Sequence, residues 1–276
     1  MFERSENRHR CCLDFVRHGP SASLGETDLL TAGTPSPIGA PRRFPYSAAM
    51  LLSDRILFLD GEAIVLDKPA GLPVDRPRDG SLSLENHLDG LRFGFRRWPL
   101  AVHRLDRDTS GCLLLARNPK AHARFTQAFE GRAVEKQYLA IIDGVPEADG
   151  GTIDLPLAKI STAERGWRMV GDAKGKPSVS HWEKIAVADG KSLLRFRPET
   201  GRTHQLRVHA LEGLGLPIVG DPVYGTGGGR DRTLLHAERI SVARGAKPPI
   251  LAEAPFPDRF AALGFAPPAG AAPTRG

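Results

Sequence analysis

A run of nine residues rich in polar side chains, His103 to Gly111, stands between two apolar runs, Leu100–Val102 and Cys112–Ala116. Because such apolar runs are typical of buried strands, the polar residues between them are expected to form a tight connection beside a core. Asp, Thr, Ser and Gly suit turns, since their short side chains bond the local backbone and Gly accepts positive φ. Polarity between buried segments is also typical of a functional site, and the spacing alone leaves both interpretations open.

One chemical interpretation of this stretch is metal-assisted phosphoryl transfer. Asp106, Asp108 and Thr109 fit the DxDxT pattern of aspartyl-phosphate hydrolases. That pattern follows an unbroken hydrophobic strand, whereas here His103 and Arg104 interrupt the strand. No later Asp-Asp pair stands out that would complete a Mg²⁺ site with carboxylate oxygens. The sequence therefore disfavours this interpretation.

A second interpretation rests on the whole stretch, because HRLDRDTSG resembles the HRLDxxTSG signature of the RluA-type pseudouridine synthases. Further landmarks of that family recur in family order. They are a strand ending in a (N/D)KPxG-like turn (64–72), a KxY motif (135–140), a GRTHQLRxH motif (199–209) and two later segments (215–225 and 234–237). The resemblance covers about residues 52 to 260.

The resemblance implies an α+β fold, with a mixed, mainly antiparallel central sheet and flanking helices, for a catalytic domain over residues 50–265. Residues 1–49 contain scattered prolines and little hydrophobic periodicity, so we expect a disordered leader there. Alternatively the start is mis-annotated and translation begins at Met50. This leader is too short and too rich in proline for the S4 RNA-binding domain that many relatives carry. We expect a disordered tail over residues 266–276.

The resemblance also implies a function, the conversion of uridine to pseudouridine in structured RNA. Without an S4 domain, and with the segments 154–157 and 175–177, the chain resembles the branch that acts on stem-loops of 23S rRNA and tRNA. The reaction breaks the N1–C1′ bond, turns the uracil and rejoins it through C5, so a nucleophile is needed, and a carboxylate can serve. The resemblance assigns that role to Asp106 and implies no metal and no organic cofactor.

Other residues acquire roles in the same way. A buried Asp106 needs a counter-charge to stay ionised, because desolvation favours the protonated carboxyl and a nearby Arg favours the charged form. The resemblance assigns Arg207 as this partner, with Arg202 as the alternative. The resemblance also implies that Tyr138 is catalytic, stacking on the flipped uridine and serving as a candidate proton relay, and that Arg104 enters the space that the uridine leaves. The remaining candidates for substrate binding are His103, Arg107, Thr109 and His204.

Structural alternatives exist for the two partners of the nucleophile. Arg207 would then form only a salt bridge, and Tyr138 would be an ordinary aromatic of a strand. A protein that keeps the fold and binds RNA without catalysis is the alternative for the whole chain. That alternative is disfavoured, because Asp106, Tyr138 and Arg207 are all present.

The charge distribution favours an RNA partner. The chain of 276 residues carries a net charge of +6, with a pI near 9.5. Residues 92–136 alone hold ten basic residues against four acidic residues. A basic segment around the candidate site is suited to a phosphate backbone, although a solvated face rich in arginine is the alternative.

Cysteine and histidine spacing disfavours a metal site. The three cysteines, Cys11, Cys12 and Cys112, lack metal-ligand or redox spacing and indicate a reducing compartment. His204 and His209 are five residues apart, which does not suit two zinc ligands on one helical face, so they are expected to hydrogen-bond within the core. No apolar run approaches the ~20 residues that cross a bilayer, and no signal peptide is apparent. We expect a cytoplasmic monomer.

Local patterns predict several elements. Two strands (56–59 and 64–66) are joined at Asp60-Gly61, a strong hairpin dipeptide. A helix begins after the N-cap Asn118 and ends at Gly131. A further helix begins near Thr203 and places His204, Arg207 and Leu211 on one face. The other expected elements are a helix with its exit (84–95), turn-rich loops (143–178) and three strands (137–142, 179–187 and 193–197).

Overall fold

The structure, a computed structural model, describes residues 51–164, 166–225 and 232–269. All of them belong to one unit of the chain, residues 44–276. The expected leader, residues 1–49, and Met50 lie outside the described residues, as does the end of the expected tail. Within the described part, the chain still buries Phe265 and Pro268 near its C-terminal end. No helix in these described ranges is long and apolar enough to span a bilayer.

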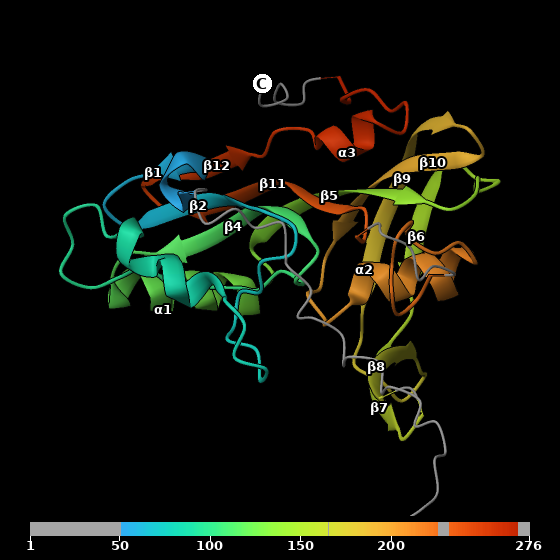
Figure 1. Ribbon diagram of the computed structural model, residues 1–276, viewed down its shortest axis with the longest axis horizontal. Coiled ribbons are helices and arrows are strands. Elements are labelled where there is room, and N and C mark those ends of the chain that lie inside the picture. The colour runs from blue at the N-terminus through green and yellow to red at the C-terminus, as the bar shows by residue number, and fades with distance from the viewer. Residues whose placement is uncertain (1–50, 165, 226–231, 270–276) are drawn as a thin grey trace, which may run out of the picture. The chain divides into compact units, whose positions relative to one another are not determined.

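One large sheet dominates the described residues (Figure 1). Its ten strands are β1 (Ile56–Leu59), β2 (Ala63–Lys68), β3 (Leu100–Ala101), β4 (Ser110–Ala116), β5 (Val134–Ile142), β6 (Gly150–Asp154), β9 (Val179–Ala188), β10 (Lys191–Pro198), β11 (Leu235–Arg244) and β12 (Lys247–Glu253). Their main order is β1-β2-β4-β11-β5-β10-β9-β6, with β3 beside β4 and β12 beside β11. Only β4 and β11 pair in parallel within the described sheet, so the predicted mixed, mainly antiparallel α+β fold is confirmed.

Short helices flank the sheet in the described residues. They are the 3₁₀ helices η1 (Leu52–Arg55) and η2 (Leu84–Leu91), the α-helices α1 (Pro119–Glu130), α2 (Gln205–Val208) and α3 (Asp258–Ala261), and the π-helical turn η3 (His209–Gly213). The α1 helix begins as predicted, because the Asn118 side chain accepts a hydrogen bond from the Ala121 N–H at 2.9 Å. It ends before Gly131 and buries Phe125 in the core cluster that includes β4.

The predicted hairpin is confirmed as the antiparallel pair β1–β2. The Asp60 carboxylate accepts hydrogen bonds from the backbone N–H groups of Glu62 and Ala63, at 2.8 and 2.9 Å, which closes the turn. The predicted strands after residue 178 are also present as β9 and β10. These elements have strong local signals in the sequence, and the structure follows those signals.

Two predicted segments differ from the structure, and a third is present in a tighter form. The segment expected to be turn-rich loops contains β6 and a two-stranded sheet of β7 (Leu157–Thr162) and β8 (Gly166–Gly171). The helix expected from residue 84 is present as the 3₁₀ helix Leu84–Leu91. The helix expected from Thr203 starts at Gln205, and His204 precedes it in the left-handed region, with φ 53° and ψ 18°. The Gln205 side chain sets this start, because its Oε1 accepts from the Arg202 N–H at 3.0 Å.

Strand β5 is covered by core residues on both faces, and the alternation of its side chains determines which face Tyr138 lies on. Leu139 and Ile141 belong to the core cluster that contains Phe256 and Phe260. Ala140 and Ile142, on the other face of the strand, belong to a second core cluster that contains Leu206 and Ala210. Because side chains alternate along a strand, Tyr138 shares the second face and is directed toward α2.

Glycine fixes the entry of the polar stretch into β4. Gly111 has φ 101° and lies opposite Ala237 in the parallel pair with β11. A Cβ atom at Gly111 would collide with the Ala237 carbonyl, so the close approach of these two strands requires glycine. The His103–Gly111 stretch is thereby placed next to the middle of the sheet.

Candidate active site

The loop that carries Asp106 is tied down by the KPxG-like turn. The Gly71 N–H donates to the Arg107 carbonyl at 2.8 Å, and the Lys68 ammonium donates to the same carbonyl at 3.0 Å. The Thr109 N–H donates to the Asp106 carbonyl at 3.2 Å and closes a turn within the stretch. The two motifs, about 40 residues apart in the sequence, therefore form one support under Asp106.

Lys68 itself is fully buried. Its ammonium also donates to the carbonyls of Pro69, at 3.1 Å, and Leu72, at 2.9 Å, so all three of its N–H donors are used. Burial lowers the pKa of Lys68 to about 7, and the charges of Asp108 and Asp106 oppose that shift. Lys68 joins the loop to the turn and does not line the cavity.

Asp106 and Arg207 form the predicted ion pair, with 3.1 Å between Arg207 Nη1 and Asp106 Oδ2. The same guanidinium makes a bidentate pair with Asp221, at 2.6 Å from Nε and 2.8 Å from Nη2. The side chain of Asp106 is 23% exposed, whereas those of Arg207 and Asp221 are 7% and 0% exposed. The alternative partner, Arg202, instead donates from Nε to the Pro177 carbonyl at 3.2 Å.

Asp221 is the residue of this cluster that sequence reasoning did not identify. Its Oδ1 also accepts from the N–H groups of Val223 and Tyr224, at 2.9 and 3.0 Å. Burial alone would raise the pKa of Asp221, but the hydrogen bonds and charge of Arg207 outweigh burial and hold it below the usual value. Burial likewise opposes the charge of Arg207, yet Asp221 and Asp106 together raise the pKa of its guanidinium. The only sequence signal was the place of Asp221 in a family segment.

His204 lies on the other side of Asp106, with 3.8 Å between its Nε2 and Asp106 Oδ2. Its Nδ1 is 2.9 Å from the Tyr224 hydroxyl, which accepts a hydrogen bond from the Met169 N–H at 3.0 Å. A hydroxyl that donates to Nδ1 leaves the proton of neutral imidazole on Nε2, toward the carboxylate. Burial lowers the pKa of His204, and the Asp106 charge opposes this shift. The arrangement favours a neutral His204 whose N–H faces Asp106.

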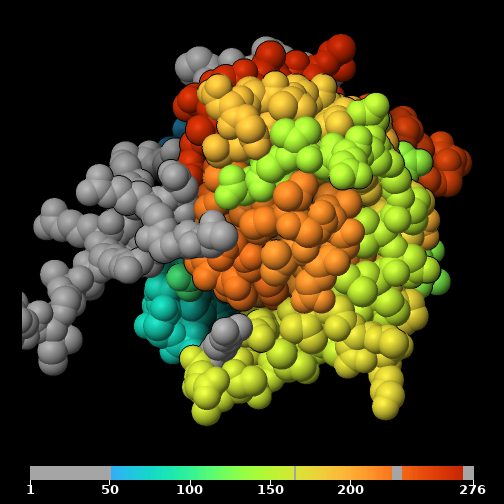
Figure 2. Space-filling view, turned by 90° about the vertical axis from the view of Figure 1, so that its right-hand side faces the viewer, coloured from blue at the N-terminus to red at the C-terminus, as the bar shows by residue number. Residues whose placement is uncertain are grey.

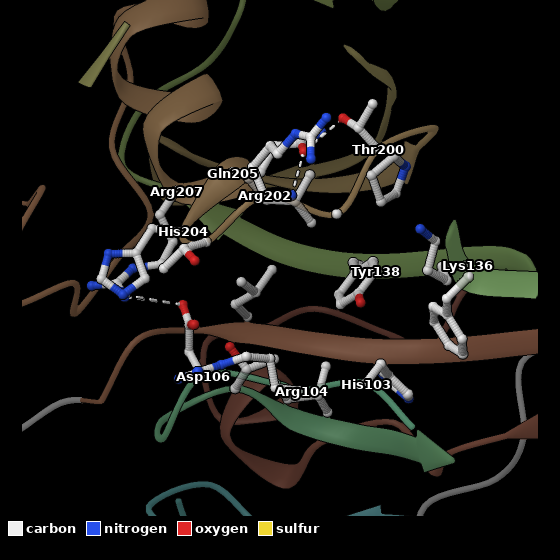
Figure 3. A pocket seen from close by; sticks show the side chains of 18 of the residues that line it. His103, Arg104, Asp106, Lys136, Tyr138, Thr200, Arg202, His204, Gln205 and Arg207 are labelled. Carbon is white, nitrogen blue, oxygen red and sulfur yellow. Dashed lines mark hydrogen bonds and ion pairs between the residues drawn. The ribbon is translucent and has the colours of Figure 1, made fainter. Parts of the chain in front are cut away.

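Tyr138 stands in the same cavity as Asp106, and its hydroxyl points into the open space (Figure 3). Burial, with a further contribution from the Asp106 charge, raises the pKa of Tyr138. The phenol therefore stays protonated at neutral pH. The ring is available as a flat surface, and the hydroxyl as a neutral donor.

The cavity has a volume of about 420 Å³, within the range of pockets that enclose small molecules, about 300 to 1,000 Å³. Eight of the nine predicted site residues line it, namely His103, Arg104, Asp106, Thr109, Tyr138, Arg202, His204 and Arg207. The ninth, Arg107, has an exposed side chain that does not contribute to the wall. Arg107 enters the site only through its carbonyl, which the supporting turn binds.

The end of the cavity away from Asp106 contains the expected residue His103 together with Lys136, which was not among the candidate site residues (Figure 3). The His103 ring stacks on Phe129 with 4.6 Å between centroids, and its Nε2 accepts from the Leu114 N–H at 2.9 Å. Burial and the charge of Lys136 lower the pKa of His103 to about 3, so this imidazole is neutral. The Lys136 ammonium, whose pKa burial lowers, has no hydrogen-bond or ion-pair partner among the described residues.

The described residues contain no group of three or more His, Cys, Asp or Glu side chains placed to hold a metal ion. His209 is fully buried. Its ring nitrogens hydrogen-bond with the Ser180 hydroxyl and the Leu155 carbonyl, both at 3.1 Å. The prediction that His209 hydrogen-bonds within the core is confirmed.

Comparison with known proteins finds a matching family model and relatives with similar sequences. The family model described as RNA pseudouridylate synthase matches residues 62–212. An uncharacterized RNA pseudouridine synthase of Zymomonas mobilis is 62% identical over 217 residues, covering 78% of this chain and 99% of that protein. The ribosomal large subunit pseudouridine synthase D of the same organism is 35% identical over 234 residues, covering 81% of this chain and 69% of that protein.

Solved structures are similar over the same region. The human RNA pseudouridylate synthase domain containing 1 superimposes with a TM-score of 0.63 at 31% identity, covering 73% of this chain and 83% of that chain. The human domain containing 4 gives a TM-score of 0.64 at 25% identity, with coverages of 76% and 91%. The sequence motifs, the sheet and the relatives agree, and the chain belongs to the RluA-type RNA pseudouridylate synthase family.

Proposed function

We propose that this RNA pseudouridine synthase isomerises specific uridines in stem-loops of 23S rRNA, of tRNA or of both, with Asp106 as its nucleophile. One relative is named for the large ribosomal subunit, which supports 23S rRNA as the first substrate to test. The proposal that tRNA is also a substrate rests only on the resemblance of the motif segments to the family. We also propose that the enzyme acts in the cytoplasm, where these RNAs are used, and that it is a monomer.

The observation that carries the proposal is the position of the Asp106 carboxylate in the cavity, beside a guanidinium that a second acid holds. A carboxylate that attacks the sugar or the base loses its negative charge when the covalent bond forms. Arg207 then keeps its two hydrogen bonds to Asp221 and stays in place to stabilise the returning carboxylate. The isomerisation breaks the N1–C1′ and C5–H bonds and forms the C5–C1′ and N1–H bonds, so a proton leaves C5, N1 gains one, and no oxidant or reductant is needed.

Tyr138 supports the step before chemistry. The target uridine has to leave its stack, which costs a few kcal/mol. Stacking on an aromatic ring returns part of that free energy, and the Tyr138 ring faces the space beside Asp106 (Figure 3). His204, on the other wall, offers an N–H close to the carboxylate. We assign Tyr138 to base stacking and His204 to positioning of Asp106.

Besides Arg207, four cationic side chains line the cavity, namely Arg104, Arg132, Lys136 and Arg202. Arg104 pairs with Asp75 at 2.9 Å, but both side chains are more than 60% exposed, so this pair contributes little and opens readily. That freedom suits the assigned role of Arg104, which enters the RNA where the uridine was. We assign the other cations to the phosphates that flank the flipped nucleotide.

The experiment that tests the proposal is pseudouridine mapping in a strain that lacks the gene. Carbodiimide treatment and primer extension over 23S rRNA and tRNA should show at least one missing pseudouridine. The wild-type gene should restore the modification, whereas the Asp106→Asn gene should not. Loss of pseudouridine only in other RNAs would contradict the proposed substrates, and restoration by Asp106→Asn would contradict the nucleophile.

A further inference from the structure

The β7–β8 hairpin stands beside the active site and brings an exposed tryptophan to it. Figure 1 shows this two-stranded sheet apart from the large sheet, and in Figure 2 its yellow-green residues project next to the orange residues of α2 and η3. The Trp167 ring stacks on His204, with 5.2 Å between centroids and 27° between planes. His204 is the residue whose Nε2 faces Asp106.

The base of the hairpin is held firmly. Leu157 is buried in a cluster with Val208 and Tyr224. The Met169 N–H donates to the Tyr224 hydroxyl at 3.0 Å, and the Gly171 N–H donates to Glu212 at 2.8 Å. Since that hydroxyl also binds His204, the same contacts set the hairpin and the imidazole. Trp167 is therefore presented by an anchored element.

Trp167 keeps a large free surface despite its contact with His204. Its relative exposure is 49%. The Lys159 ammonium lies 5.1 Å from the centre of the Trp167 ring. An exposed indole with an adjacent cation provides both parts that a nucleotide needs, a flat surface for the base and a positive charge for its phosphate.

We propose that Trp167 binds an unpaired nucleobase next to the target uridine by stacking, with Lys159 close to the phosphate of that nucleotide. The inference rests on the proposed stem-loop substrate. When one base of an RNA loop enters the cavity, the neighbouring bases lose a stacking partner. The Trp167 indole supplies a new stacking surface close to the cavity, because it contacts His204, which in turn lies beside Asp106. RNA rather than a protein partner is favoured, because this surface adjoins the cavity of an RNA-modifying enzyme.

The first experiment measures kinetics on an unmodified in vitro transcript of 23S rRNA. Trp167→Ala should raise KM by about 5- to 150-fold, the range expected for losing one stacked base, and Trp167→Phe should recover most of that loss. Trp98→Ala is the matched control, because Trp98 is 52% exposed and has the Arg92 guanidinium 5.4 Å from its ring but does not line the cavity. Equal losses in both alanine variants, or a fall in kcat with KM unchanged, would overturn the inference.

The second experiment does not depend on the fold of an alanine variant. Tryptophan fluorescence of Asp106→Asn protein that also carries Trp98→Phe reports on Trp167 and the buried Trp182. Titration with the transcript should quench the emission, as stacking on a base does, and unchanged emission at saturating RNA would refute the stacking contact. If wild-type enzyme makes no pseudouridine in the transcript, the proposed substrate fails. If wild type reacts but Trp167 variants match the control, only this inference fails.

Discussion

Arg207 donates two hydrogen bonds to Asp221, at 2.6 and 2.8 Å, and one to Asp106, at 3.1 Å. The two acids therefore have different tasks. Asp221, fully buried, fixes the guanidinium, whereas Asp106 meets only one of its N–H groups and keeps part of its surface open to the cavity. An arginine held in this way can stabilise a negative charge on Asp106 without moving when that charge disappears.

Removing Asp221 should cost stability as well as activity. Asp221→Ala leaves a buried guanidinium without its main partner, which is expected to lower the free energy of unfolding by about 3 to 5 kcal/mol. Asp106→Ala is the matched control, because its more exposed carboxylate makes only one of the three hydrogen bonds. Urea unfolding of both variants measures the difference. Equal losses of stability would contradict the division of tasks between the two acids.

The stabilising effect of Asp221 should depend on pH in acid. Burial opposes its ionisation, but Arg207 lowers the pKa below the usual 3.8. The unfolded chain thus takes up this proton before the folded protein does, so the stabilisation is complete above pH 3.8 and is lost as the pH falls through the folded pKa. The difference in unfolding free energy between wild type and Asp221→Asn should be constant from about pH 8 to about pH 5 and shrink below about pH 4. A constant difference throughout would contradict the charge interaction.

Tyr138→Phe and Tyr138→Ala separate the ring from the hydroxyl. The Phe variant should keep the fold and RNA affinity, because it keeps the stacking surface. The Ala variant should lose activity and about 1 to 3 kcal/mol of binding free energy. Filter binding and turnover on the same transcript measure both. If Phe is as inactive as Ala, the protonated hydroxyl takes part in the chemistry, and if both variants are active, the base does not stack on Tyr138.

Lys136 should contribute to the salt dependence of RNA binding. Its ammonium lines the cavity without a partner among the described residues, so a phosphate is its expected ligand. Lys136→Met should lower the slope of log affinity against log salt by about 0.7, the loss of one phosphate contact to single-stranded RNA. Lys120→Met, at an exposed position of α1 outside the cavity, should leave the slope unchanged. Equal slopes for all three proteins would exclude a phosphate at Lys136.

Elements with local signals could be predicted from the sequence. The Asp60-Gly61 turn and the Asn118 cap act within a few residues, and both form as expected. The sequence does not predict the β7–β8 hairpin, because its polar strands lack a clear alternation and Leu157 at its base packs against the distant residues Val208 and Tyr224. Such contacts join distant parts of the chain and leave no local pattern.

In the active site too, the contacts between distant residues are those that local sequence patterns do not predict. The ion pair of Asp106 with Arg207 joins residues 101 positions apart and was expected only from the family resemblance. Asp221 as the second partner of Arg207 could not be read from spacing. His204 was expected on a helical face, but its left-handed backbone places it before the helix, where it reaches both Asp106 and Tyr224.

The most direct test of the account is turnover by Asp106→Asn. The substitution keeps the side-chain volume but removes the negative charge and, with it, the proposed nucleophile. Because Arg207 keeps both hydrogen bonds to Asp221, the variant should fold, and it should bind RNA as well as wild type or slightly better. Nuclease digestion and mass spectrometry of the transcript should find no pseudouridine after incubation with this variant, alongside a wild-type control. Pseudouridine formed by folded Asp106→Asn would contradict Asp106 as the nucleophile.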